Sequence, residues 1–251
     1  MRVLATFAVD WECKPWLRLG RFRADCVNGR VFCGEIGGHN VSVIITGIGP
    51  DNAMRSIRSF VDNAPDVCIT SGLAGGLKNQ HRPGEILAAR SVRAENSALS
   101  FESDERLFTA AIECGAKPVG QFISTGRVIR TAQEKSHLGI SADAVDMESF
   151  AVMKEMSSLG VPCVAVRAVS DSAEMDLPCD FASTLDHSGR IRMVRVLGQV
   201  AADPRRAWPL ARLGMQSSRA AASLARYLTA YVGYLGEIKE KMDFRVQHVS
   251  Q

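Results

Sequence analysis

The chain has 251 residues, of which 46% are hydrophobic and 23% are charged, and these fractions are typical of a soluble globular protein. They exclude a disordered chain, a collagen-like chain and a coiled-coil rod. The formal net charge is only +3, which is too small to indicate a nucleic-acid partner. The length suits one large domain, and we expect residues 1–203 to form it and residues 204–251 to form a helical extension.

The cysteines and the N-terminus indicate a compartment. Seven cysteines are scattered singly, with no CxxC pair, which is typical of reduced and mostly buried thiols. The first ten residues contain no long apolar segment of an export leader and are typical of a first β-strand. We therefore expect a cytoplasmic protein. We also consider that it contacts the inner membrane peripherally.

Strand and helix patterns alternate along the first 170 residues. Short apolar, β-branched runs predict strands at 2–9, 41–46, 66–70, 85–89, 119–124 and 161–169. Helically spaced apolar residues predict helices at 51–63 and 103–115, and a run without Gly or Pro predicts a third helix at 146–159. The alternation predicts a single α/β domain with a mixed, twisted β-sheet flanked by helices. Because ligands of such sheets bind beyond the carboxyl ends of the strands, candidate residues are those that follow each strand.

The C-terminal region has a different pattern. Arginines repeat every seven residues, at 205, 212, 219 and 226, which keeps them on one side of a helix. Leucines and other apolar residues follow helical spacing on the other side. This predicts a basic amphipathic helix, either continuous or broken near Gly214. Two interpretations remain open: the helix packs on the domain or a sister subunit, or it contacts an anionic membrane surface with Trp208 nearby.

Two glycine-containing segments follow predicted strands. Residues 46–50 read TGIGP, and Gly49 lies where backbone amides at a helix start attract anions. A dinucleotide-binding fingerprint would require glycine at position 52, which holds Asn52, so an NAD enzyme is disfavoured. Residues 71–77 read SGLAGGL and predict a loop whose amides bind phosphate or a carbonyl, with a sharp crossover turn as the alternative.

Two further candidates are acidic residues, one after a short apolar lead-in to a predicted helix and one after a predicted strand. Glu148 lies beside Met147 at a helix start, where it either complements the helix dipole or accepts hydrogen bonds from two sugar hydroxyls. Asp171 follows the strand 161–169 with Ser170 beside it, so it is either a helix N-cap or a general acid. Neither residue on its own distinguishes between these interpretations.

A fifth candidate is Glu12, which we expect in the loop after the first strand, either as a surface acid or as a base over the same cleft. Five histidines have no partners at metal-ligand spacing, and no HExxH motif exists, so we expect no bound metal. The sequence also lacks a GxSxG nucleophile elbow and a P-loop, which disfavours serine hydrolases and P-loop enzymes.

The order of these segments resembles a known family. Glu12, TGIGP, SGLAGGL, VDMES and VRAVSD occur in the order found in the nucleoside phosphorylase family, which also contains methylthioadenosine/adenosylhomocysteine nucleosidases. The resemblance covers residues 1–175 and, within the family, is greatest to the hopanoid-associated phosphorylases, which are thought to remove adenine from adenosylhopane. It implies a nucleoside phosphorylase-like catalytic domain, phosphate as a co-substrate, no other cofactor, and a homo-oligomer.

The resemblance also implies roles for individual residues. Glu148 would bind the ribose 2′ and 3′ hydroxyls, with Met147 packed beneath the sugar. Asp171 would protonate N7 of the departing purine, and Ser170 would help to position it. In the nucleosidases of the family, the residue at the position of Glu12 orients or deprotonates the attacking water.

The sequence indicates the residues around the nucleophile less clearly than those around the sugar and the base. Candidate donors to a phosphate are Gly49, Gly75, Arg55 and Arg127, although both arginines could equally face solvent. Ile129 stands where the family often has an aromatic residue against the base. Leu73 stands where nucleosidases have Ser or Thr, so a hydroxyl near the nucleophile is missing.

The sequence therefore predicts an enzyme that cleaves the N-glycosidic bond of a 5′-modified adenosine by phosphorolysis, with an adenosylhopane-type substrate. The first alternative is hydrolysis of methylthioadenosine or adenosylhomocysteine. The alternative of another class is a non-catalytic, membrane-associated nucleoside-binding protein.

Overall fold

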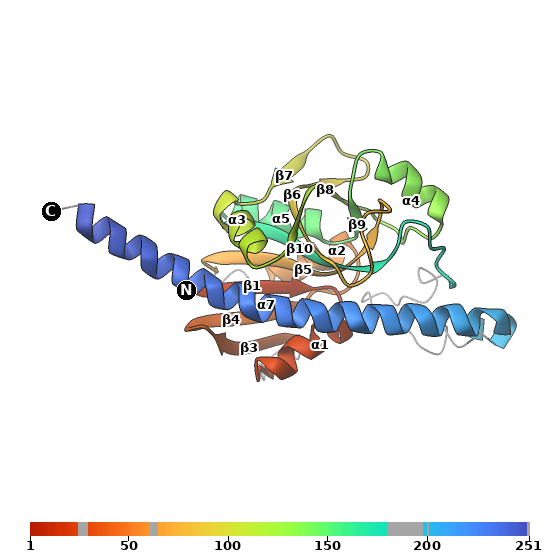
Figure 1. The fold of residues 1–251 in the computed structure, drawn as a ribbon, viewed down its shortest axis with the longest axis horizontal. Helices are drawn as coiled ribbons and strands as arrows, with labels where there is room; N and C mark the ends of the chain where they lie inside the picture. The colour runs from red at the N-terminus through yellow and green to blue at the C-terminus, as the bar shows by residue number, and fades with distance from the viewer. Residues whose placement is uncertain (25–29, 61–64, 180–197, 200, 250–251) are drawn as a thin grey trace.

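The computed structural model describes residues 1–24, 30–60, 65–179, 198–199 and 201–249, and in these its strands form one mixed sheet flanked by helices (Figure 1). The strands are β1 (Arg2–Phe7), β2 (Arg23–Ala24), β3 (Val31–Ile36), β4 (His39–Ile45), β5 (Val67–Gly76), β6 (Ile86–Ala94), β7 (Ser100–Glu102), β8 (Lys117–Ser124), β9 (Ala144–Asp146) and β10 (Cys163–Asp171). The helices are α1 (Asp10–Leu19), α2 (Pro50–Arg58), α3 (Glu105–Glu113), α4 (Ala132–Gly139), α5 (Ser149–Ser158), the 3₁₀ helix η3 (Pro204–Arg206) and α7 (Ala207–Val249). The predicted single α/β architecture is confirmed.

The central strands of the sheet close on themselves. β5 pairs with β10 and β9, β9 pairs with β8, β8 pairs with β6, and β6 pairs with β10. β1 and β10 both run parallel to β5, and the sheet continues through β1 to β4, β3 and β2. The carboxyl ends of β1, β5 and β10 therefore meet at one edge of the sheet, where ligands of parallel strands bind.

The C-terminal helix α7 packs against the domain and crosses the molecule in Figure 1. Leu224 and Leu228 share a hydrophobic cluster with strand residues such as Phe7, and full burial of each leucine stabilises the fold by about 1.5–3 kcal/mol. The Tyr231 hydroxyl also donates a hydrogen bond to the Leu107 carbonyl oxygen at 2.8 Å. Gly214 does not interrupt the helix. The described residues contain no helix with both the length and the apolar character of a transmembrane span.

One glycine-rich segment differs from its predicted structure. Residues 71–76 of SGLAGGL continue strand β5 and do not form the expected loop. Gly72 has φ +133, and a Cβ there would lie only 2.7 Å from Arg167 Nη1 and 2.9 Å from Glu12 Oε2. Glycine is therefore required at this position both by the positive φ, which other residues rarely adopt, and by two charged side chains that approach the strand backbone.

Other element boundaries also shift. Helix α1 begins at Asp10, so Glu12 lies in its first turn and not in a loop. The helix predicted at 146–159 begins at Ser149, because residues 144–146 pair with β5 and β8 as strand β9. Helix α2 begins at Pro50, and residues 61–63 of the helix predicted there lie outside the described residues. Strands β2, β3, β7 and β9 and helices α1 and α4 were not predicted.

Candidate active site

A cavity of about 620 Å³ lies at the edge where β1, β5 and β10 end, and its volume is typical of a small-molecule site. Eight predicted site residues line it: Glu12, Gly75, Arg127, Ile129, Met147, Glu148, Ser170 and Asp171. Helix α7 also contributes lining residues, including Leu210, Leu213 and Ser217. The fold thus brings together residues that are far apart in the sequence.

Glu148 is held at the junction between β9 and α5, as the N-cap of α5. Its Oε1 accepts a hydrogen bond from the backbone N–H of Gly49 at 2.8 Å, so the TGIGP segment positions a carboxylate. Burial raises the pKa of Glu148 from 4.5 to about 7, although the nearby Arg167 guanidinium lowers it. A buried carboxylate fixed in this way can accept further hydrogen bonds from a ligand's hydroxyl groups.

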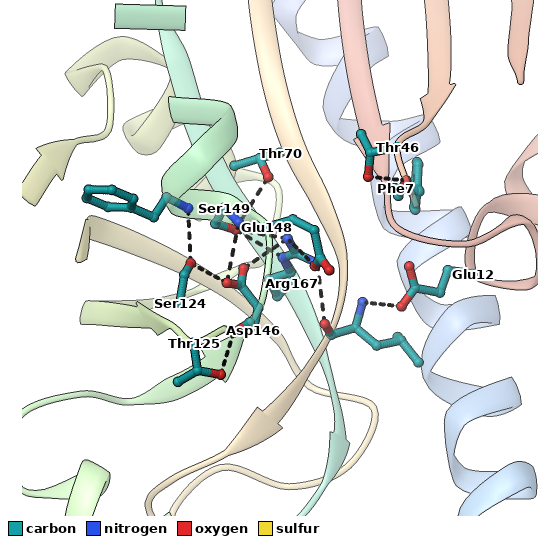
Figure 2. A network of polar contacts seen from close by, with 12 residues as sticks. Phe7, Glu12, Thr46, Thr70, Ser124, Thr125, Asp146, Glu148, Ser149 and Arg167 are labelled. Carbon is teal, nitrogen blue, oxygen red and sulfur yellow. Dashed lines mark hydrogen bonds and ion pairs between the residues drawn. The ribbon is translucent and has the colours of Figure 1, made fainter. Parts of the chain in front are cut away.

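Arg167 is a buried cation in the middle of the apolar strand β10 (Figure 2). Its Nη2 lies 2.9 Å from Asp146 Oδ2 and 3.8 Å from Glu148 Oε2. The same nitrogen donates a hydrogen bond to the Ser149 hydroxyl at 3.0 Å. Asp146 therefore serves as the counterion of Arg167. A single arginine within an otherwise apolar strand was the sequence signal for this buried network.

Glu12 reaches the same network from helix α1 (Figure 2). Its Oε1 accepts a hydrogen bond from the Leu73 backbone N–H at 3.3 Å, whereas its Oε2 has no hydrogen-bond partner among the described residues. Burial raises the pKa of Glu12 from 4.5 to about 7, and the charge of Arg167 opposes this shift. A cavity-lining carboxylate with a free oxygen and this pKa suits a general base near neutral pH.

Asp171 ends strand β10, and no helix follows it in the described residues up to 179, so it is not a helix N-cap. The Ser170 hydroxyl lies 2.5 Å from Asp171 Oδ1, and the Lys135 ammonium donates to Asp171 Oδ2. Lys135, on α4, was not predicted to be functional. The Thr131-x-x-Glu134 capping box could have revealed α4, but its contact with Asp171 has no signal in the sequence.

The predicted phosphate donors have different surroundings. Gly75 lines the cavity, and Gly49 donates to Glu148. Arg55 is exposed on α2 and does not line the cavity, which matches the solvent-facing interpretation. Arg127 lies at the cavity, but its guanidinium pairs with Glu134 at 2.5 Å and with Glu95 at 3.8 Å. Among the described residues, no cluster of His, Cys, Asp and Glu side chains is suited to a metal ion.

Proteins related to this chain by sequence are named for one enzymatic activity. The 5′-methylthioadenosine/S-adenosylhomocysteine nucleosidase of Actinobacillus succinogenes is 28% identical over 197 residues, which cover 68% of this chain and 85% of that protein. The nucleosidase of the same name from Haemophilus influenzae is 26% identical over 223 residues, which cover 79% of this chain and 97% of that protein.

Solved structures share the fold. The Helicobacter pylori 5′-methylthioadenosine/S-adenosylhomocysteine nucleosidase, in complex with a substituted pyrrolidin-3-ol, has a TM-score of 0.70 and 18% identity over 92% of this chain and 97% of that one. Futalosine hydrolase of the same organism has a TM-score of 0.70 and 19% identity over the same shares of the two chains. The family model described as the phosphorylase superfamily matches residues 19–191, which is more than half of the chain. This protein therefore belongs to the phosphorylase superfamily.

Proposed function

We propose that this protein hydrolyses the N-glycosidic bond of a 5′-modified adenosine and releases adenine. The observation that carries the proposal is that Glu12, Glu148 and Asp171 line one cavity. Cleavage of an N-glycosidic bond puts positive charge on the ribose and negative charge on the purine, so it requires carboxylates near the sugar and an acid near the base. The nucleosidase names of the sequence relatives support the same reaction.

The charges around the cavity favour water over phosphate as the nucleophile. A phosphate dianion requires free cations or amides, but Arg127 is paired with two carboxylates and Arg55 faces solvent. Arg167 is already paired with Asp146, and Glu12 adds a carboxylate that would repel phosphate when ionised. The hydrolytic alternative therefore has more support than the phosphorolysis expected from the sequence.

In the proposed mechanism, each acidic group has a separate task. Glu148 accepts hydrogen bonds from the ribose 2′ and 3′ hydroxyls, while Met147 packs beneath the sugar. Glu12 orients the attacking water with its free oxygen and takes up its proton. Asp171 delivers a proton to N7 of the leaving adenine, and Ser170 fixes one of its oxygens. A protein that only bound nucleosides would require no proton donor at the base, which favours an enzyme over the non-catalytic alternative.

Product analysis tests the proposal. We expect incubation with adenosines of varied 5′ group to release adenine and free sugar in equal amounts, whether or not phosphate is present. The series should include methylthio, homocysteinyl and long apolar 5′ groups, because Leu210 and Leu213 give part of the cavity an apolar wall and an adenosylhopane-type substrate remains a prediction. A sugar 1-phosphate that forms only with phosphate would establish phosphorolysis, and no adenine from any compound would contradict cleavage.

We further propose that the outer side of α7 contacts an anionic membrane surface. Trp208 is 73% exposed and Met215 is 50% exposed, seven residues apart on one side of the helix. Arg212 and Arg219 are exposed on the same side, and each arginine near an anionic surface contributes about 1 kcal/mol. Exposed apolar side chains among arginines suit the interface between lipid headgroups and water.

Vesicle flotation tests the membrane contact. The protein is expected to float with phosphatidylserine vesicles and not with phosphatidylcholine vesicles, and the combined change Trp208→Ser, Arg212→Gln and Arg219→Gln should reduce this binding at least about tenfold. Deletion of α7 is unsuitable as a test, because that helix completes the hydrophobic core. The matched control is Arg82→Gln with Arg106→Gln, which removes two exposed arginines elsewhere. Equal flotation of all three proteins would contradict the proposal.

A further inference from the structure

Lys135 carries a buried ammonium group that has no role in the mechanism proposed above. Its side chain is only 1% exposed, although it lines the cavity. Its Nζ donates to Asp171 Oδ2, to the Ser172 carbonyl oxygen at 2.9 Å and to the Met175 carbonyl oxygen at 2.8 Å. All three donors of the ammonium are therefore occupied, as a buried charge requires.

The Asp171 carboxyl group is consequently held at both oxygens. Lys135 contacts Oδ2, and the Ser170 hydroxyl lies 2.5 Å from Oδ1. Rotation of the carboxyl group would break a contact on each side, so its orientation toward the cavity is fixed before a ligand enters.

We propose that Lys135 is a positioning residue that acts through Asp171 in the proton transfer to the leaving base. This inference rests on the proposed function. With substrate bound, the Asp171 carboxyl group carries one proton, which it has taken up from solvent. As the glycosidic C–N bond breaks, its electron pair passes to the purine, and this proton passes to N7. Asp171 becomes a carboxylate beside the Lys135 ammonium, which keeps its three protons and stabilises the new negative charge. A fixed cation at the point where charge develops lowers the barrier without reorganisation.

A purely structural role is the competing explanation. The contacts with Ser172 and Met175 also tie the segment after β10 to α4, and loss of this tie would impair the site in a different way. The two roles make different predictions once Asp171 can no longer donate a proton. If Lys135 acts through Asp171, replacing it should not lower kcat further in a protein that already lacks the acidic proton of Asp171. If Lys135 only holds the segment after β10 in place, replacing it should lower kcat by the same factor with or without that proton.

A double-mutant cycle separates these roles, with adenine release as the readout. Lys135→Met is expected to lower kcat by about 10²-fold while KM changes less than about threefold. The same substitution is expected to change kcat less than about threefold in an Asp171→Asn protein. Lys135→Gln should reproduce both results, so the test does not depend on one variant. Lys135→Arg, which keeps the charge, should retain at least about tenfold more turnover than Lys135→Met.

Lys78 provides the matched control. Its ammonium lies 2.7 Å from Asp143 Oδ1, but Lys78 does not line the cavity, so Lys78→Met should leave kcat and KM unchanged. Circular dichroism and thermal unfolding verify that each variant folds. Wild-type turnover in a Lys135 variant, or an equal loss in both Asp171 backgrounds, would overturn the inference. A wild-type protein that releases no adenine would instead overturn the proposed function, and this inference with it.

Discussion

Replacing Asp171 with Asn is expected to lower kcat for adenine release by at least about 10²-fold, which is the lower end of general-acid contributions. The amide has nearly the same shape and can still accept a hydrogen bond from the Lys135 ammonium. It has no acidic proton for N7 of the leaving purine, so the base would have to depart as an anion. Steady-state kinetics on the substrate found by product analysis measures this effect, with KM expected to change little.

Asp66→Asn is a suitable control for this substitution. Asp66 pairs with Arg2 at the surface at 3.0 Å and does not line the cavity, so its replacement should leave kcat unchanged. Thermal unfolding of both variants verifies that the loss of activity does not reflect unfolding. A correctly folded Asp171→Asn protein with near-normal turnover would remove Asp171 from the mechanism.

The convergence of the acidic residues was predictable in part from their positions in the chain. Asp171 follows strand β10 closely enough to lie at the edge where parallel strands end, and Glu148 follows the short strand β9. The rule that ligands bind beyond the carboxyl ends of such strands required no knowledge of side-chain contacts. The position after a predicted strand therefore placed Asp171 at the cavity, whereas strand β9 was not predicted and the family resemblance implied the role of Glu148.

The cation that pairs with Asp171 was not predictable in the same way. Lys135 lies 36 residues before Asp171, and nothing in the local pattern of α4 distinguishes it from a surface lysine. Arg55 and Arg127 illustrate the same problem, because an arginine near a glycine-rich segment can face a ligand, a carboxylate or solvent. Which of these occurs depends on tertiary packing, as the pairing of Arg127 with Glu134 shows.

The loop prediction for the SGLAGGL segment was wrong for a related reason. Several glycines in a short run indicate backbone conformations or close contacts that other residues do not allow, but they do not say which. At Gly72 the causes are a φ of +133 and the approach of Glu12 and Arg167, both of which come from other elements. The sequence pattern of one segment does not indicate which side chains from other segments pack against it. The glycines of this strand were therefore interpreted as a loop.

Replacing Glu12 with Gln is expected to lower kcat by at least about 10²-fold, because the amide cannot take up a proton from the attacking water. In the wild-type protein, kcat/KM should fall as the pH decreases below about 7, since Glu12, with a pKa of about 7, then becomes protonated. Glu148 has a similar pKa and contributes to the same limb of the profile. Rate measurements from pH 5 to 9 check this, and a flat profile would exclude a catalytic carboxylate with this pKa.

The same substitution is expected to stabilise the fold at alkaline pH. The pKa of Glu12 is raised from 4.5 to about 7, so its protonated form favours the folded state; this contribution is complete below 4.5 and is lost as the pH rises through 7. Gln does not titrate, so the stability of Glu12→Gln relative to wild type should rise from pH 5 to 8 by about 1–3 kcal/mol.

Thermal unfolding across this pH range measures the difference, with Glu105→Gln as the control because Glu105 is 69% exposed and pairs only at the surface. Arg167 keeps Asp146 as its counterion in the Glu12→Gln protein, so no buried cation is left unpaired. A stability difference that is constant with pH would show that Glu12 is ionised at no cost to the folded state. If Glu12→Gln instead gains stability and loses turnover, Glu12 is a residue that destabilises the fold but is required for activity.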